Sequence, residues 1–202
     1  MAKRLPRETL RDDMTLPIIT SEMTSIVECV QADFDDPNIA KSIRFSPTAL
    51  KQARNVLLNG GTIITDTLLV RKGIDRASLD ALGLQCKCFI NEPSVLRVAE
   101  SRCATRAEVA LDLAMTAPGL KMFVIGSAPA TLSHLLSRYS PAQLHDAVIV
   151  ATVTGFVNAV QLKERLFESG YACVIVRGKK GGVSAAISLT NAILRTALEQ
   201  LD

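Results

Sequence analysis

The stretch KMFVIGSAPATLSHLLSRY, residues 121–139, contains the unit from which the fold can be predicted. Its first six residues (121–126) are mostly apolar and include Val, Ile and Phe, which is typical of a strand buried on both faces of a sheet. A short loop with Gly, Ser and Pro follows, and residues 128–139 then carry apolar side chains at helical spacing. The stretch therefore predicts a strand that leads directly into a helix, as in parallel α/β proteins.

The same unit recurs on both sides of this stretch. Further strands are predicted at 62–65, 87–90, 147–155 and 172–178. Helices are predicted at 47–61, 92–101, 105–116, 156–170 and 181–201. Alternating strands and helices indicate an α/β fold with three layers, α/β/α, in which a doubly wound, mainly parallel sheet has five strands. We expect a flexible N-terminal segment at 1–14 and a single domain over 15–202.

Composition narrows the classes of function. The chain of 202 residues has a net charge of +3, too small to favour a nucleic-acid partner. Cys86 and Cys88 lie two residues apart with no His within twenty residues, which is poor spacing for zinc, so we predict no metal. No apolar run approaches the roughly 20 residues that span a membrane. The charged N-terminus lacks the apolar core of a signal peptide, and we expect a cytoplasmic protein with reduced cysteines.

Candidate ligand contacts lie in the loops that follow the predicted strands, because ligands bind at the carboxyl ends of parallel strands. The loop RGKKGG, residues 177–182, offers three cations, backbone N–H groups and the start of a helix. Such a loop suits phosphate or carboxylate, although it matches no nucleotide-binding motif. The alternative is a solvated turn whose lysines only favour solubility.

Two other helix starts are ambiguous. Ser127 and Pro129, in the stretch GSAPAT, suit a ligand loop, but Ser127 as an N-cap and Pro129 in the first turn also explain a well-formed helix start. Arg106 opens a predicted helix, where its charge opposes the helix dipole unless an anion offsets it. His134 and His145 lie outside the strand-end loops, so we expect packing or surface roles for them.

Five segments in order resemble one known family. They are DTLLVRKGI (66–74), CFINEPSVLRVAESRCATRAEVALDL (88–113), VIGSAPATLSHLL (124–136), GFVNAVQLKERL (155–166) and RGKKGGVSAAISLTNAIL (177–194). Together they resemble the precorrin-8X methylmutases and cobalt-precorrin-8 methylmutases of cobalamin biosynthesis. The resemblance spans roughly residues 24–199, and several motifs in register are more specific than any one alone.

The resemblance implies a flavodoxin-like fold, a homodimer and an isomerase that moves a methyl group from C-11 to C-12 of a tetrapyrrole ring. It implies no organic cofactor and no metal catalyst. Because the tetrapyrrole substrate carries many carboxylates, the basic and Gly-rich loops become candidate contacts. The implied substrate-binding residues are Asp66, Thr105, Arg106, Ser127, Thr154, Gly155, Phe156, Arg177, Gly178, Lys179, Gly181 and Gly182.

The segment IVECVQADFDD, residues 26–36, departs from the family pattern. Members carry His-Ala-Thr-(Ala/Gly)-Asp-Phe-Asp, whose His is the proposed acid. Here Ala32-Asp33-Phe34-Asp35 matches the end of that motif, and Cys29 stands at the position of the His. Ile26 stands where an Arg is common. An ordinary thiol titrates about two pH units above imidazole, so Cys29 is the weaker acid.

Three hypotheses follow. The first is a methylmutase-like isomerase with Cys29 at the acid position. The second is a non-catalytic tetrapyrrole-binding or corrinoid carrier protein derived from the same fold. The third is an unrelated α/β module that binds a small phosphate compound at the basic loop.

Overall fold

The structure, a computed structural model, describes residues 20–155 and 157–201. It contains one sheet of six strands in the order β1-β6-β5-β4-β2-β3. The strands are β1 (Ile43–Phe45), β2 (Thr62–Thr65), β3 (Gln85–Lys87), β4 (Lys121–Ile125), β5 (Ala147–Ala151) and β6 (Cys173–Val176). All neighbouring strands run parallel except β1, which pairs antiparallel with β6.

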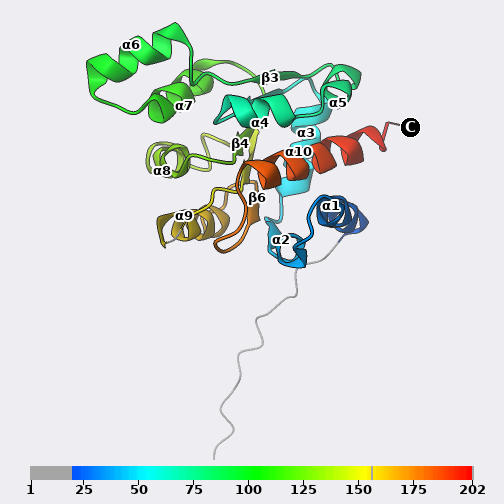
Figure 1. Ribbon diagram of the computed structural model, residues 1–202. Coiled ribbons are helices and arrows are strands. Elements are labelled where there is room, and N and C mark those ends of the chain that lie inside the picture. The colour runs from blue at the N-terminus through cyan, green and yellow to red at the C-terminus, as the bar shows by residue number, and fades with distance from the viewer. Residues whose placement is uncertain (1–19, 156, 202) are drawn as a thin grey trace, which may run out of the picture.

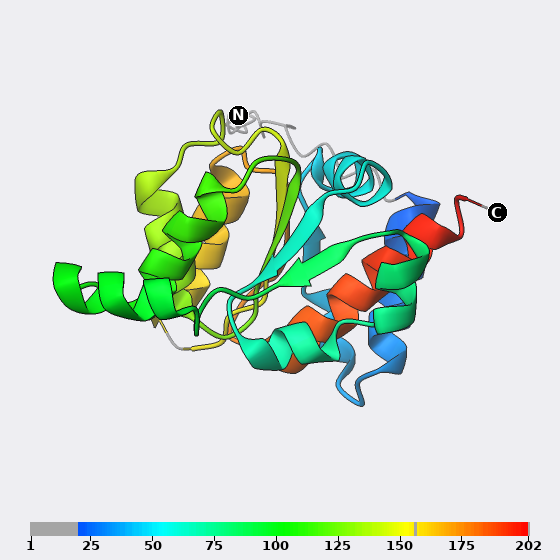
Figure 2. The same cartoon turned by 90° about the horizontal axis from the view of Figure 1, so that it is seen from above.

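Helices cover both faces of the sheet (Figures 1 and 2). They are α1 (Ser21–Ala32), α2 (Pro37–Lys41), α3 (Ala49–Leu58), α4 (Leu68–Gly73), α5 (Arg76–Ala81), α6 (Pro93–Arg102), α7 (Arg106–Thr116), α8 (Pro129–Arg138), α9 (Val157–Glu168) and α10 (Val183–Leu198). Helices α1, α3, α4, α5 and α10 share one core cluster, and α7, α8 and α9 share the other. The predicted three-layer α/β/α fold is confirmed.

Alternation along each strand divides the core between the two faces. On β4, Met122 and Val124 pack with the α10 layer, whereas Phe123 and Ile125 pack with the α7–α9 layer. All four side chains are buried, which explains why this strand is a continuous apolar run in the sequence.

The prediction of five strands was wrong by one. Residues 43–45 add a short antiparallel edge strand, and its three residues are too few to show a strand pattern in the sequence. The strand predicted at 87–90 lies instead at 85–87. Phe89 and Ile90 are apolar because they line a pocket rather than because they belong to the strand.

The parallel strands have the order of the flavodoxin type. The chain passes from β2 outward to β3, and then returns across β2 to continue through β4, β5 and β6. The direction of winding therefore reverses between β2 and β4, and the crevice at the carboxyl ends of these two strands is the usual ligand position in such sheets.

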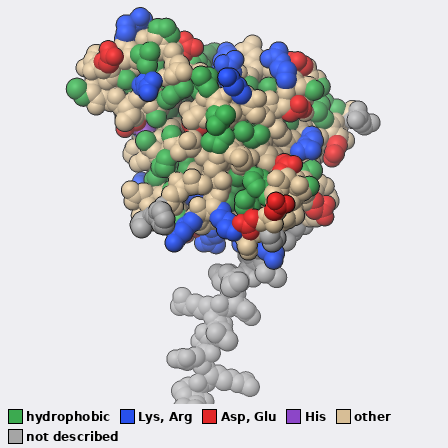
Figure 3. All heavy atoms as spheres, viewed as in Figure 1, with side chains coloured by type: hydrophobic (Ala, Val, Ile, Leu, Met, Phe, Trp, Pro, Cys, Tyr) green, Lys and Arg blue, Asp and Glu red, His purple; other side chains and the backbone are tan. Residues whose placement is uncertain are grey.

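The predicted flexible segment 1–14 lies outside the described residues, and the single domain over 15–202 stays a prediction. Within the described part of the chain, no helix has the length and apolar character needed to cross a membrane. Lys and Arg side chains lie among Asp and Glu on the face shown in Figure 3, in keeping with the small net charge.

Candidate active site at the carboxyl edge of the sheet

Asp66 joins the two loops that border the β2–β4 crevice. It directly follows β2 and is only 8% exposed. One carboxylate oxygen, Oδ2, accepts hydrogen bonds from the backbone N–H groups of Ser127 (2.7 Å) and Ala128 (2.8 Å). The sequence suggested that Ser127 is the N-cap of α8, but Ala128 holds that position, without a hydrogen bond from its side chain. Pro129 is the first helical residue.

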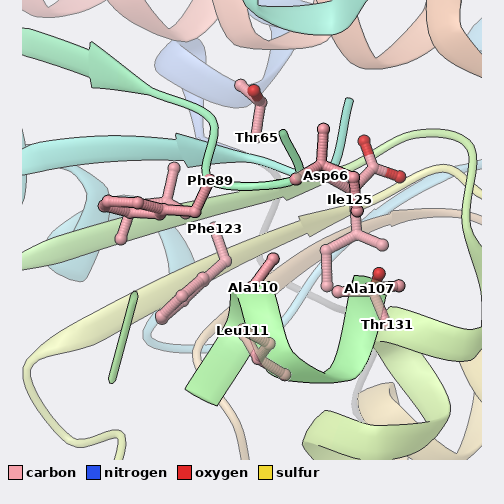
Figure 4. Close-up of a pocket in the computed structure, with 11 residues that line it drawn as sticks. Thr65, Asp66, Phe89, Ala107, Ala110, Leu111, Phe123, Ile125 and Thr131 are labelled. Carbon is pink, nitrogen blue, oxygen red and sulfur yellow. The ribbon is translucent and has the colours of Figure 1, made fainter. Parts of the chain in front are cut away.

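A pocket opens beside Asp66 (Figure 4). Its lining comes from the ends of β2 and β4, the loop after β3, and helices α7 and α8. Phe89 and Phe123 make the wall apolar, and Asp66, Thr65 and Thr131 supply its polar side chains. Thr131 lies in the first turn of α8 and was missed by sequence analysis, because a Thr in a helix start has no distinguishing signal.

The basic loop 177–182 is packed tightly against the end of β5. The N–H of Gly182 donates to the carbonyl of Thr152 at 2.5 Å, and the Thr152 hydroxyl donates back to the carbonyl of Gly182 at 2.9 Å. Gly181 has a φ of +132°, and a Cβ there would overlap the Thr152 carbonyl oxygen. The loop therefore requires glycine at this close approach of two backbones.

Two cations of the basic loop are held by carboxylates of the protein. The guanidinium of Arg177 forms two contacts with Glu164 of α9, at 2.9 and 2.8 Å, and these raise the pKa of Arg177. Lys180 donates to Asp36, and this hydrogen bond contributes most to lowering the pKa of Asp36 to about 2. Lys179, between them, is exposed. A carboxylate ligand at this loop would compete with Glu164 and Asp36 for the same cations.

Lys163, on α9, is a buried charged residue that sequence analysis missed. Its side chain is 0% exposed, and its ammonium donates to the carbonyl of Lys180 at 3.1 Å. Burial lowers the pKa of Lys163 from 10.5 to about 8. Its place under the basic loop distinguishes it from an ordinary surface lysine, and a lysine within the amphipathic pattern of α9 gives no such signal in the sequence.

The segment that contains Cys29 lies against the start of α10. Helix α1 packs along α10, and Asp33, one turn after Cys29, accepts a hydrogen bond from Ser188 at 2.6 Å. Cys29 is half-buried and packs against the core, and Ile26 is fully buried. The segment is thus joined to the helix that follows the basic loop. No hydrogen bond connects Cys29 itself to the strand-end loops within the described residues.

The remaining predicted contacts on α7 are partly used by the fold. Thr105 is the N-cap of α7: its hydroxyl and N–H both bond the Glu108 carboxylate, and it accepts from the Glu108 N–H. Arg106 begins the helix and lines a groove with α6, while the next residue, Ala107, lines the Asp66 pocket. Thr105 is therefore occupied as a cap, and Arg106 lies next to the pocket wall.

Three further candidates lie in the two loops beside the crevice. Thr154 and Gly155 are exposed after β5, and Thr154 lies against Gly182 of the basic loop. Gly178 has a φ of +77°, a conformation that suits glycine, and has open space around it. The predicted contact Phe156 lies outside the described residues.

Asp112 on α7 ties that helix to α8. It accepts hydrogen bonds from the Tyr139 hydroxyl (2.6 Å) and bonds His134 Nε2 (2.8 Å). Burial acts to raise the pKa of Asp112, but these hydrogen bonds outweigh it, and the pKa is lowered. His134 thus has a packing role, as predicted.

Comparison with known proteins identifies the family. A family model described as precorrin-8X methylmutase matches residues 6–196. The chain is 35% identical over 164 residues to a cobalt-precorrin-8 methylmutase of Salmonella typhimurium, covering 81% of this chain and 75% of that protein. It is 31% identical over 187 residues to a precorrin-8X methylmutase of Pseudomonas aeruginosa, covering 92% and 89%.

A solved structure described as a precorrin-8X methylmutase related protein has the same fold. It superimposes with a TM-score of 0.80 at 30% sequence identity, covering 89% of this chain and 94% of that chain. Sequence and fold therefore agree over nearly the whole chain. The protein belongs to the precorrin-8X methylmutase family.

Proposed function

We propose that the protein is an isomerase that moves a methyl group from C-11 to C-12 of precorrin-8X or cobalt-precorrin-8 in cobalamin biosynthesis. The observation that carries the proposal is the family match over residues 6–196. Relatives named for the cobalt-containing and for the cobalt-free substrate are both similar to this chain. The two substrates differ in the metal at the centre of the ring and present the same kind of carboxylate periphery to the protein.

The proposed binding site is the carboxyl edge of the sheet. The substrate contacts are Asp66, Thr105, Arg106, Ser127, Thr154, Gly155, Phe156, Arg177, Gly178, Lys179, Gly181 and Gly182. Cations and backbone N–H groups in the basic loop suit the carboxylates of the ring periphery. Arg177 and Lys180 are already oriented by Glu164 and Asp36, so the loop is ordered before the substrate binds.

Cys29 takes the place of the acid in this proposal. Its thiol would donate a proton to the ring, the methyl group would migrate, and the same proton would return to the sulfur, so that the reaction is a net isomerisation. A thiol is ordinarily a weaker acid than imidazole, and a fraction of that difference would reach the barrier. We therefore expect turnover that is slower than with histidine.

The experiment is incubation of the purified protein with precorrin-8X and, separately, with cobalt-precorrin-8. Formation of hydrogenobyrinate or its cobalt analogue is followed by absorbance and mass spectrometry. Conversion supports the isomerase. Binding without conversion would support a corrinoid carrier, which the comparisons do not favour. Absence of binding to either compound would refute both.

The assembly proposed for this function is a homodimer, as the family resemblance implies, and sedimentation equilibrium tests it. The apolar side chains of Leu69 (63% exposed) and Leu96 (36% exposed) are available for such a contact. The cytoplasmic location stays a prediction.

A further inference from the structure

Two buried polar atoms in the β2–β4 pocket have no hydrogen-bond partner. They are Oδ1 of Asp66 and Oγ1 of Thr131, in residues that are 8% and 6% exposed, and neither finds a partner among the described residues. Both side chains line the pocket (Figure 4). Leaving such atoms unpaired costs about 1–3 kcal/mol each, and nearly all buried polar groups in folded proteins are paired. Two unpaired polar atoms that line the same pocket therefore point to a polar occupant.

The loop contacts account for one carboxylate oxygen of Asp66, Oδ2, and leave the other, Oδ1, without a role. Its Oδ2 ties the loop after β2 to the start of α8 through Ser127 and Ala128. Oδ1 has no such partner among the described residues, and Asp66 lines the pocket at the carboxyl end of β2, where the winding of the sheet reverses and ligands bind in this fold type.

The two atoms specify the chemistry of the group. Oδ1 of an ionised Asp66 can only accept a hydrogen bond, whereas the Thr131 hydroxyl can donate one. A neutral carboxylic acid satisfies both, with its O–H toward Asp66 and its carbonyl oxygen toward Thr131. An ionised carboxylate would place a second negative charge beside Asp66 and would be disfavoured.

The size of the pocket limits what enters it. Its volume of about 20 Å³ is little more than the roughly 10–15 Å³ that one water needs, so only the tip of a side chain could enter it. The apolar wall of Phe89 and Phe123 excludes water from around that group. A pyrrole ring is too large, and the ring system would remain outside, at the edge of the sheet.

We propose that Asp66 and Thr131 bind one side-chain carboxylic acid of the tetrapyrrole in its protonated form. This subsite rests on the proposed function, because the tetrapyrrole supplies the acid. It contrasts with the basic loop, which suits ionised carboxylates. The two regions are contiguous, since Gly126, before Ser127, abuts Val183 at the start of α10. One substrate would thus be held by an acid-binding pocket and an anion-binding loop.

Asp66→Asn tests the protonation state directly. The amide oxygen of Asn must face the two backbone N–H groups, so its NH₂ would point into the pocket and favour an ionised carboxylate. Hydrogenobyrinic acid is the probe, and its dissociation constant is measured by absorbance titration from pH 6 to 8. The parent takes up one proton when it binds the acid. As the pH rises, its affinity for hydrogenobyrinic acid should therefore fall by about tenfold per pH unit more than the affinity of the variant falls.

Other ionisable groups near the pocket are common to both proteins, so the difference between the two pH profiles isolates Asp66. They include Glu92, whose N–H donates to the carbonyl of the lining residue Phe89, and Arg106, Glu108 and Asp112 on α7, which supplies lining residues, with His134 bonded to Asp112. Asp66 is the one ionisable residue among the described residues that line the pocket. Far-ultraviolet circular dichroism checks that the variant is folded.

Thr131→Val gives a second test that does not depend on the Asp66 loop contacts. It keeps the shape and removes the hydroxyl, so we expect hydrogenobyrinic acid to bind about three- to tenfold more weakly. Thr190→Val is the matched control, because the Thr190 hydroxyl on α10 is also buried without a partner but lies outside the pocket. The control is expected to leave the affinity unchanged.

The outcomes separate this inference from the proposed function. The acid subsite is overturned if the parent and Asp66→Asn have equal pH profiles, or if Thr131→Val and Thr190→Val have equal affinities. In either case, binding and turnover by the parent protein would still support the methylmutase proposal. If Asp66→Asn does not fold, the valine pair decides. No binding of hydrogenobyrinic acid by the parent overturns the proposed function and the subsite together.

Discussion

Replacement of Lys163 by Met tests whether a buried ammonium holds the basic loop. Lys163 is fully buried, and among the described residues its side chain donates one hydrogen bond, to the carbonyl of Lys180 at 3.1 Å. Met has a similar length and no charge. The variant therefore removes the charge and the hydrogen bond while it keeps most of the packing of α9 against the sheet.

The stability effect depends on pH in a defined direction. Burial lowers the pKa of Lys163 from 10.5 to about 8, so the folded protein binds this proton more weakly than the unfolded chain. The charged lysine therefore destabilises the fold below pH 8, and the penalty disappears as the pH rises from about 8 to about 10.5. The full difference corresponds to about 3 kcal/mol, and relaxation of the protein around the buried ammonium reduces the expected value to about 1.5 kcal/mol.

Removing the buried charge stabilises the variant at pH 7. Loss of the hydrogen bond to Lys180 offsets part of that stabilisation and costs the variant about 1 kcal/mol. At pH 7 we expect the two proteins to differ by less than about 1 kcal/mol in free energy of unfolding. By pH 10 the parent should have gained about 1 kcal/mol relative to Lys163→Met. Urea unfolding at pH 7, 8, 9 and 10 measures the difference, in which contributions from other titrating groups cancel.

Ligand binding by Lys163→Met gives the functional readout. Without the ammonium, the Lys180 carbonyl and the loop around it lose an anchor, and we expect about tenfold weaker binding of hydrogenobyrinic acid. Lys121→Met is the control: Lys121 also donates to a carbonyl, that of Gly119 at 2.9 Å, but it begins β4 at the opposite edge of the sheet. A stability difference that does not vary with pH, or equal binding by the two variants, would refute this reasoning.

Three further changes test other parts of the site and fold. Cys29→His should raise the rate of methyl transfer, and an unchanged or lower rate in a folded variant would show that Cys29 does not occupy the acid position. Gly181→Ala should cost about 3 kcal/mol in urea unfolding and abolish corrinoid binding, because its Cβ would overlap the Thr152 carbonyl, whereas Gly60→Ala, also at positive φ but in open space, should cost about 1 kcal/mol. Asp112→Asn should lower the melting temperature at pH 7; since the folded pKa of Asp112 is lowered, the deficit should shrink as the pH falls toward 3, and a constant deficit would contradict that role.

The sequence predicts the parallel sheet well because its signal is strong where burial is complete. The run 121–125 is apolar on both faces and forms β4, and Thr62–Thr65 forms β2 as predicted. The edge strands were harder. Residues 43–45 gain their strand conformation from pairing with β6, and such a tertiary contact leaves no periodic pattern in three residues.

Some residues of the candidate site were likewise predictable from the sequence, and others were not. The positions of Asp66 and the basic loop at the carboxyl edge were predictable, because both follow strands and the fold type itself brings strand ends together. Lys163 and Thr131 were not, since each looks like an ordinary residue of an amphipathic helix. What marks them is burial, and in Thr131 the lack of a partner, and both are properties of the packed structure.

The helix layers on the two faces of the sheet offer different residues to a ligand that lies across its carboxyl edge. Cys29 on α1 and Asp33 directly after that helix lie in the layer of α10, whereas the Asp66 pocket opens into the layer of α7 and α8. A flat ring at the carboxyl edge could contact both layers at once. In that arrangement the acid subsite fixes one side chain of the ring and thereby its rotation about the edge. Orientation of this kind contributes to rate independently of acid strength, so it bears on how a thiol could serve at the position where the family resemblance implies an imidazole.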